Sequence, residues 1–447
     1  MKNTPTFNLK AVIQMTGLSA DTLRAWERRY HLPEPERTPG GQRIYSQRDI
    51  SILQWLMIKQ SEGLSISNAV GLWNDLFNNG NDPLEEDRPS MANQIVNFSN
   101  GEMGTSLDSL RGQWKQACLD FNESLANQVS NTAFAIASPE LVCNEIFMKG
   151  LSELGEGWYQ GEVTVEQEHF ASGLVLRRLG SLISSTPPSN RNETILICCT
   201  TGERHSLPTT YLTFLLRRRG YKVIELGADV PHSHLQETVQ KIHPQLVILS
   251  AQQLVNAVEL KRTAQTLANT VPVGYGGRIF KTSPSLIKGI PAFFLGDMLE
   301  EAPGIIKDII NKKPGSMMDE LENPYQNLHE LFEQKLQSIF SLISILNSTW
   351  DPSDGNLSSA THFINNAVSA ALYFGDLDLL LPELRWLEGF LINRHYRRDQ
   401  IVDLWHRYTE SIHKVLGQEA APLINWFDLY LSIQEMPGKN TQVLSIN

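Results

Sequence analysis

Apolar residues follow two patterns along the chain, and the two patterns predict different folds. From residue 105 to 185 they recur every three or four positions, as on one face of a helix: Leu107, Leu110, Trp114, Cys118 and Phe121. From residue 194 to 295 short apolar runs alternate with amphipathic stretches of about 10 to 15 residues. The second pattern predicts a parallel, doubly wound sheet that follows a block of helices.

The alternating stretch can be divided into individual elements. We expect strands at residues 194–200, 221–226, 245–250, 271–275 and 292–295, and helices at 207–219, 232–242 and 256–269. Polar stretches without apolar periodicity lie at 78–94, 185–193 and 311–325 and predict breaks between domains. The remaining regions, 1–77 and 322–435, are expected to be largely helical.

Composition narrows the classes of protein. The net charge of -11 means that any contact with nucleic acid depends on a local basic patch. The four cysteines show no metal-ligand spacing and predict reduced thiols. The N-terminus lacks an apolar signal segment, and no stretch reaches the ~18 apolar residues of a membrane span. We therefore expect a cytoplasmic protein that does not cross a membrane.

The N-terminal stretch carries a local basic patch. Between residues 24 and 48 the sequence contains six arginines and three glutamates, so this stretch is locally basic. The spacing predicts a short helix, a turn at Gly17 and a second helix with Ser19 as its N-cap. That second helix carries the residues best suited to contact DNA: Thr22, Arg24, Arg28 and Arg29. A hairpin wing is expected at Pro39-Gly40-Gly41, followed by Arg43-Ile44-Tyr45.

The sequence TLRAWERRY, followed by GGQRIYS and RDI, resembles the MerR family of winged-helix transcription regulators from Asn8 to about Leu76. The resemblance implies that helix 19–30 enters the major groove of an operator in double-stranded DNA. It also implies that Arg24, Arg43 and Tyr45 contact phosphates and that the protein binds as a dimer. A polar stretch stands where this family has a dimerisation helix, so the oligomer contacts are expected further along the chain.

The first predicted strand of the sheet is followed by Gly202-Glu203-Arg204-His205. Strand ends are where parallel sheets hold ligands, and a carboxylate near a histidine orients it as a metal ligand. Ser250 ends a later strand, and Gly276-Gly277 follows another. Glycines at this edge allow a ligand to approach the backbone closely.

These residues resemble the cobalamin-binding Rossmann-like domain, whose pattern is Asp-x-His-x-x-Gly, then Ser-x-Leu, then Gly-Gly. The resemblance covers about 193–310 and implies that His205 is the lower ligand of cobalt and that Glu203 hydrogen-bonds its other ring nitrogen. It also implies that the nucleotide tail threads between sheet and helix. The chain departs from the pattern in three places: Glu203 replaces aspartate, Pro208 replaces glycine, and Gln252 replaces leucine.

The preceding helical block contains Trp158 followed after nine residues by Glu168-His169. This spacing resembles the light-sensing MerR-type cobalamin regulators of the CarH/LitR type. The resemblance implies a cofactor, adenosylcobalamin, with Trp158 shielding the adenosyl group and Glu168 hydrogen-bonding it. It implies that His169 can become an upper cobalt ligand after photolysis. It further implies a dark tetramer that represses transcription and that light dissociates.

The predicted fold class is therefore multidomain α and α/β. We expect a winged helix-turn-helix at 1–77, a four-helix bundle that caps the cofactor at 95–187, a Rossmann-like sheet at 190–312 and a helical domain at 322–447. For the last of these, two interpretations stay open. One is a bundle for dimerisation or a protein partner. The other is a second ligand pocket, in which the arginines and histidines near Trp386 and Trp405 hold a bilin or haem: Arg394, His395, Arg397, Arg398, His406 and Arg407.

Three functions remain. The first is a DNA-binding repressor that senses light through adenosylcobalamin. The second is a MerR-type regulator that uses the cobalamin fold without light, for another ligand or a protein partner. The third is a cobalamin carrier of a methyltransferase or mutase. The sequence shows no nucleophile triad, phosphate loop or zinc motif at recognisable spacing, so we do not expect an enzyme.

Overall fold

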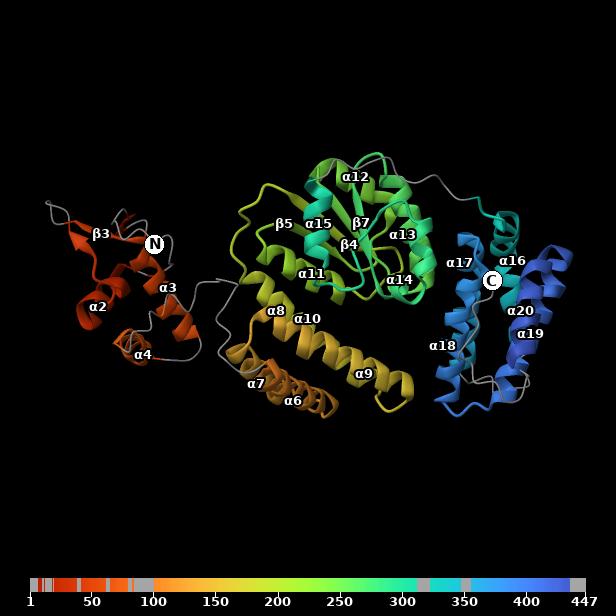
Figure 1. The fold of residues 1–447 in the computed structure, drawn as a ribbon, viewed down its shortest axis with the longest axis horizontal. Helices are drawn as coiled ribbons and strands as arrows, with labels where there is room; N and C mark the ends of the chain where they lie inside the picture. Colours follow the sequence, from red (N-terminus) through yellow and green to blue (C-terminus); the bar gives the residue numbers. More distant parts are fainter. Residues whose placement is uncertain are drawn as a thin grey trace. The chain divides into compact units, whose positions relative to one another are not determined.

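The computed structural model describes residues 7–9, 12, 18, 20–37, 42–61, 65–78, 83, 100–311, 322–346 and 355–434. Contacts within the chain define two compact units, residues 1–98 and 99–447 (Figure 1), and each is described by itself. The predicted turn at Gly17, the N-cap Ser19 and the wing tip Pro39-Gly40-Gly41 lie outside the described residues, as do most of the stretches 78–94 and 311–325.

The first unit is a small helical domain with an antiparallel sheet. Helix α2 (Ala20–Tyr30) precedes strands β2 (Glu36–Arg37) and β3 (Arg43–Tyr45). Strand β3 pairs on its other side with β1 (Phe7–Asn8), so the hairpin expected for a wing is present. Helices α3 (Gln47–Ser61) and α4 (Ile66–Asn78) complete the domain. Their core is formed by buried apolar side chains: Leu23, Trp26, Tyr45, Leu53, Trp55 and Trp73.

The second unit begins with the helical block that the periodicity predicted. It contains α6 (Asn100–Leu119), α7 (Glu123–Ile136), α8 (Pro139–Val142), a π-helical turn (Cys143–Met148), α9 (Lys149–Gln160) and α10 (Val165–Ser184). Helix α9 ends at Gly161, whose φ of 82° requires glycine. Helix α10 then starts with a capping box at its N-cap, Thr164. The Thr164 hydroxyl accepts from the Gln167 backbone amide, and the side-chain oxygen of Gln167 accepts from the Thr164 backbone amide.

The predicted doubly wound parallel sheet is confirmed. Its strands are β4 (Thr194–Cys199), β5 (Lys222–Gly227), β6 (Leu246–Ser250), β7 (Val273–Gly276) and β8 (Phe293–Phe294). They pair in the order β5-β4-β6-β7-β8 and all run parallel. The connections therefore leave in opposite directions from β4 and β6, and this change of direction opens a crevice at the carboxyl ends of those two strands.

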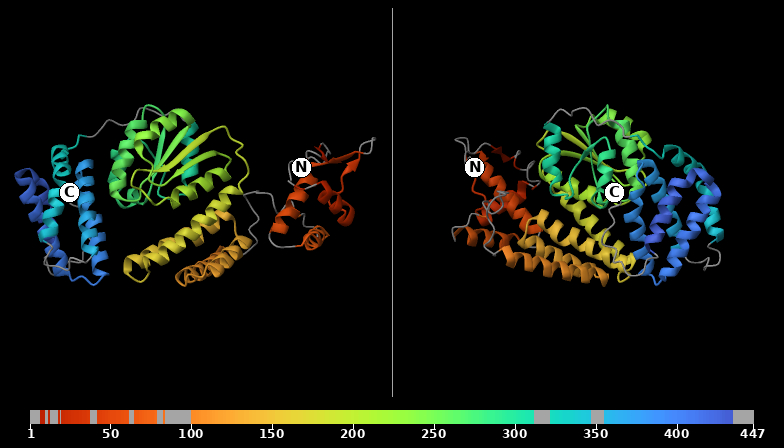
Figure 2. Two further views of the ribbon diagram at one scale, coloured as in Figure 1. Left: turned by 180° about the vertical axis from the view of Figure 1, so that it is seen from behind. Right: turned by 45° about the vertical axis from the view of Figure 1, so that its right-hand side comes forward.

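Helices cover both faces of this sheet (Figure 2). On one face, α11 (Leu207–Arg218) and α15 (Ala302–Asn311) pack on the buried strands. On the other face lie α12 (His232–Ile242) and α13 (Leu254–Leu267). Helix α11 also contributes Tyr211, Phe214 and Leu215 to the core of the helical block, so one helix joins that block to the sheet.

The C-terminal helices share a hydrophobic core with the sheet domain. They are α16 (Gln326–Leu346), α17 (Gly355–Phe374), α18 (Leu380–Ile392), α19 (Arg398–Leu416) and α20 (Ala421–Gln434). The core of α13 continues into α17, and Lys261 and Arg262 lie over the ring of Tyr373. No helix in the described parts of the chain is long and apolar enough to cross a membrane.

The capping box of α10 supports a prediction about local stability. Thr164→Ala removes the oxygen that accepts from the Gln167 amide, and we expect a loss of about 1 kcal/mol at this helix end. Amide hydrogen exchange in the first turn of α10 should become faster. Thr266→Ala, at an exposed position of α13, is the control and should leave that turn unchanged. Equal exchange in the wild type and Thr164→Ala would show that the cap does not hold the turn.

Candidate functional site

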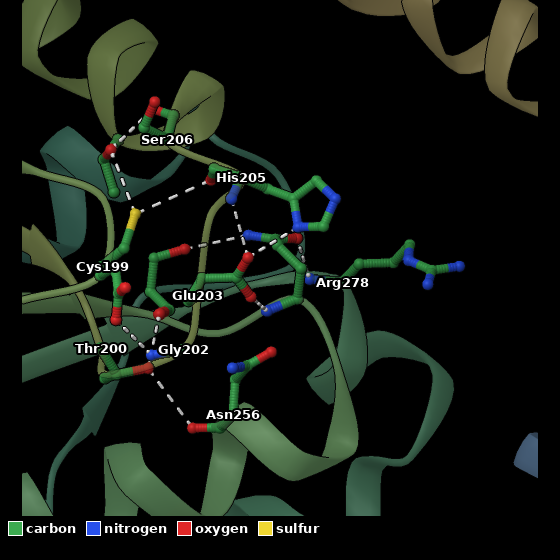
Figure 3. Close-up of polar contacts among 12 residues, drawn as sticks. Cys199, Thr200, Gly202, Glu203, His205, Ser206, Asn256 and Arg278 are labelled. Atoms are coloured by element: carbon green, nitrogen blue, oxygen red, sulfur yellow. Dashed lines mark hydrogen bonds and ion pairs between the residues drawn. The ribbon is translucent and has the colours of Figure 1, made fainter. Parts of the chain in front are cut away.

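The loops that follow β4, β6 and β7 meet at the carboxyl edge of the sheet (Figure 3). The first of these loops turns at Gly202, which has a φ of 78° and whose amide donates to Asp229 Oδ1 at 2.7 Å. The turn places Glu203 inside the protein and His205 at its surface. Gly202 stands where the backbone enters the left-handed region, which glycine adopts without steric cost, and the pair of Glu203 and His205 follows it.

Glu203 and His205 form a tight pair. The distance between His205 Nδ1 and Glu203 Oε1 is 2.6 Å, and the His205 amide donates to the same oxygen at 2.8 Å. The Glu203 side chain is fully buried, whereas 63% of the His205 side chain is exposed. The imidazole is therefore fixed through Nδ1, and Nε2 points away from Glu203 (Figure 3). This is the arrangement of a histidine that binds a metal through its other nitrogen.

Hydrogen bonds keep the buried carboxylate of Glu203 ionised. Burial acts to raise its pKa, but the hydrogen bonds from His205 and from the Gln252 amide (2.7 Å to Oε2) outweigh it and lower the pKa. Asn256, with its amide turned to satisfy both groups, donates to Oε2 at 3.1 Å and accepts from the Glu203 amide at 3.2 Å. The hydrogen bond to Glu203 in turn raises the pKa of His205 against the effect of burial.

Gln252 links the three loops. Its backbone amide holds Glu203, its side-chain amide donates to Ser250 Oγ at 2.9 Å, and its Oε1 accepts from the Arg278 amide at 2.9 Å. The sequence identified Gln252 only as a departure from the motif. Its role depends on contacts between residues 49 and 26 positions apart, which a local pattern does not reveal.

A cavity of about 260 Å³ lies beside this pair, between the sheet and α11. Ser250, Gly276 and Gly277 line it, as the resemblance predicted for the nucleotide tail. Pro208 is part of the cavity wall, so this departure from glycine leaves the space open. A side chain at Gly276 would meet no atom within 4 Å, which agrees with an open cradle at this position.

Glu168 and His169 lie in the first turn of α10. The distance between His169 Nδ1 and Glu168 Oε2 is 2.6 Å, and Ser172 Oγ donates to the other Glu168 oxygen at 2.5 Å. The charge of Glu168 adds to the rise in the pKa of His205. Glu168 therefore lies near enough to His205 for their charges to interact.

Trp158, at the end of α9, has neighbours that the sequence did not predict. Its ring centroid lies 5.6 Å from that of Phe390 and 6.4 Å from that of Trp386, both on α18. The guanidinium of Arg394 lies 5.4 Å from the centre of the same ring. Only the helical spacing of α18 suggested that it presents an aromatic face.

The residues named for a second ligand pocket in the C-terminal domain contact several different partners. Arg397 pairs with Asp399 at 3.0 Å and Arg407 with Asp403 at 2.8 Å. Trp405 is buried, and its ring nitrogen donates to Glu388 at 3.0 Å. Arg394 turns instead toward Trp158. The spacing along α18 and α19 placed these residues near one another in sequence, but their side chains leave toward different partners.

The predicted DNA-binding residues of the first unit lie on two elements. Arg24, Arg28 and Arg29 are exposed on α2, and Thr22 is partly buried there. Arg43 Nε lies 2.7 Å from Glu27 Oε2, which ties the wing strand to α2.

Tyr45 is fully buried, contrary to the prediction that it contacts a phosphate. Its hydroxyl donates to Glu27 Oε1 at 2.5 Å, beside the oxygen that Arg43 contacts. Tyr45 therefore joins the wing strand to α2 through Glu27.

Comparison with known proteins matches three parts of the chain. Residues 7–75 match the family model described as MerR HTH family regulatory protein, and residues 110–183 and 193–297 each match a model described as B12 binding domain.

Three relatives are similar to parts of this chain. The HTH-type transcriptional repressor CarH of Myxococcus xanthus is 29% identical over 61% of this chain and 89% of its own length. The HTH-type transcriptional repressor CarA of the same organism is 28% identical over 55% of this chain and 76% of its own length. The trimethylamine corrinoid protein of Methanosarcina barkeri is 30% identical over 31% of this chain and 65% of its own length.

Gly276, the last residue of β7, and Gly277, which follows it, allow a matched test of the site's backbone. A Cβ at Gly277 would lie 1.8 Å from the Ala251 carbonyl oxygen, and its φ of 140° disfavours any side chain. We expect Gly277→Ala to destabilise the sheet domain by ~1–3 kcal/mol, whereas Gly276→Ala should be close to neutral. Thermal unfolding of the two variants measures the difference. Equal melting temperatures would contradict the close approach of the two loops.

Proposed function

We propose that this chain, which combines a MerR helix-turn-helix module with both B12 binding domains, is a cobalamin-dependent repressor that senses light. The observation that carries the proposal is His205, fixed by buried Glu203, whose partner Gln252 lines an open cavity. In this proposal residues 1–77 bind DNA, 95–187 cap the cofactor and 190–312 hold it from below.

The donor set suits cobalamin. Among the described residues no group of three or more His, Cys, Asp or Glu side chains could hold a metal ion by itself. A single imidazole is enough for cobalt because the corrin ring supplies the equatorial nitrogens. His205 offers that imidazole, with Nδ1 on Glu203 to increase its basicity. The cavity lined by Ser250, Gly276 and Gly277 has room for part of the nucleotide tail.

When bound, adenosylcobalamin supplies a cobalt–carbon bond that visible light can break. Residues of the chain hold the cofactor on both sides. Glu203 holds His205 on the lower side. Trp158 and Glu168 would line the side of the site that takes the adenosyl group, and His169 would offer a second imidazole there. The packing of α9 and α10 would then depend on whether that side is filled, and packed helices switch between discrete arrangements.

DNA binding is assigned to α2 and the wing. Arg24, Arg28 and Arg29 provide positive charge on an otherwise acidic chain. Binding to paired half-sites requires a homo-oligomer, dimer or tetramer, which the light-dependent change at α9 and α10 would assemble or separate.

A light-independent use of the same fold is the first alternative, and a cobalamin carrier is the second. The likeness to a trimethylamine corrinoid protein over 31% of this chain favours the carrier for the central domains taken alone. The MerR module at residues 7–75 favours regulation for the chain as a whole. Transfer of a methyl group from a methylated amine to the bound cofactor would distinguish the carrier.

His205→Ala tests the lower ligand. We expect the wild type to bind adenosylcobalamin in the dark with the absorbance of the base-off, histidine-ligated form, and His205→Ala to lose that spectrum. His234→Ala, an exposed histidine on α12, is the control and should match the wild type. An unchanged spectrum in His205→Ala would remove His205 from the cobalt site.

Light dependence is tested on the loaded protein. DNA fragments selected from a random pool by the dark, loaded chain should bind tightly in the dark and weakly after green light, with a matching change in elution volume. Arg24→Ala should weaken dark binding and reduce the slope of affinity against salt by about one counterion. Identical elution and DNA binding before and after light would leave only the light-independent alternative.

A further inference from the structure

Helix α18 of the C-terminal domain contacts the end of α9 that carries Trp158. Trp386 and Phe390 stack on each other at 5.4 Å and both lie beside Trp158. Trp386 also lies 5.7 Å from the ring of Tyr159, whose hydroxyl donates to the Trp386 carbonyl at 3.2 Å. The contact is therefore both apolar and hydrogen-bonded.

The same contact fixes the backbone at the end of α9. Arg394 donates to the carbonyls of Trp158 at 3.2 Å and of Tyr159 at 3.3 Å, and Asn393 donates to the Tyr159 carbonyl at 3.0 Å. Carbonyls in the last turn of a helix lack partners within the helix, and a cation is favoured there. The C-terminal domain thus adds side-chain donors to the last turn of α9, whose Trp158 carbonyl also accepts from the Gly161 amide.

The approach of the two helices is close. A Cβ at Gly389 of α18 would lie 1.9 Å from the Tyr159 hydroxyl oxygen, so only glycine leaves room for this packing. Glycine inside a helix costs about 1 kcal/mol relative to alanine. The close contact with Tyr159 explains why α18 has a glycine at position 389.

Helix α18 also carries a carboxyl group whose charge interacts with that of Arg278, in the segment after β7. Glu383 lies one turn before Trp386, and its burial raises its pKa to about 7, which the positive charge of Arg278 opposes. Arg278 follows Gly277 and acts on the pKa of His205 as well. Helix α18 therefore carries both the rings that lie beside Trp158 and a carboxyl group whose pKa responds to the charge of Arg278.

We infer that α18 is a third wall of the cobalamin site and that Phe390, Trp386 and Arg394 position Trp158 for the upper ligand. This inference rests on the proposed function. The C-terminal domain then determines which upper ligand the site accepts. Because Trp158 touches α18 on one side and the upper ligand on the other, docking of α18 and binding of that ligand strengthen each other by the same factor.

The test compares two forms of the cofactor on the full chain. Adenosylcobalamin has a bulky upper ligand, and hydroxocobalamin has a small one. Arg394→Ala and Gly389→Ala should bind adenosylcobalamin in the dark about tenfold more weakly than the wild type, the scale of one desolvated cation–π contact. Both variants should bind hydroxocobalamin normally. Arg397→Ala, a nearby arginine paired with Asp399, is the matched control and should bind both forms like the wild type.

Hydrogen exchange supplies an independent readout. Adenosylcobalamin should slow amide exchange along α18 in the wild type and in Arg397→Ala, and should do so much less in Arg394→Ala. Equal affinity of all variants for adenosylcobalamin would overturn the inference and leave the proposed function standing. Equal weakening for both cofactor forms would also overturn it, because α18 would then support the site without reading the upper ligand. A wild type that binds neither form would overturn the inference together with the proposed function.

Discussion

The hydrogen bond between buried Glu203 and the exposed ring of His205 is the interaction on which the central site depends. A carboxylate taken out of water is costly unless several donors compensate it. Here the donors come from the loops after β4 and β6 and from α13, through His205, Gln252 and Asn256. The carboxylate therefore both orients the imidazole and holds together the loops that surround it. Removing Glu203 would release the ring and leave those donors without an acceptor.

This edge of the sheet is connected to the rest of the second unit through helices. Helix α11 follows the histidine loop and shares its apolar side chains with the helical block, so the two sides of the site are joined by one element. Helix α18 adds a second connection, because its aromatic side chains pack on Trp158 at the end of α9. A change of ligand between these elements would act on side chains of the sheet domain, of the helical block and of the C-terminal helices. Such packing favours a switch between two arrangements over gradual deformation.

The sequence was sufficient for most of the fold and for the residues of the central site that carry a local signature. Strand and helix periods located the parallel sheet, and the spacing from strand end to Glu203 and His205 located the candidate ligand pair. Contacts between distant residues were not predictable in this way. Gln252 looked like a lost leucine but bridges three loops. The resemblance implied that Tyr45 contacts a phosphate, whereas the structure buries it on Glu27, a contact between residues 18 positions apart that a local motif does not reveal. The docking of α18 on Trp158 depends on two helices more than 200 residues apart.

The most direct test of the central claim is electron paramagnetic resonance of the cobalt(II) form bound to the protein, prepared once with natural histidine and once with ¹⁵N-histidine. The account predicts that each cobalt line carries a triplet splitting from one axial nitrogen and that ¹⁵N-histidine converts the triplet to a doublet. A triplet that remains after labelling would show that the cofactor's own base, and not His205, is the lower ligand, and would contradict the account.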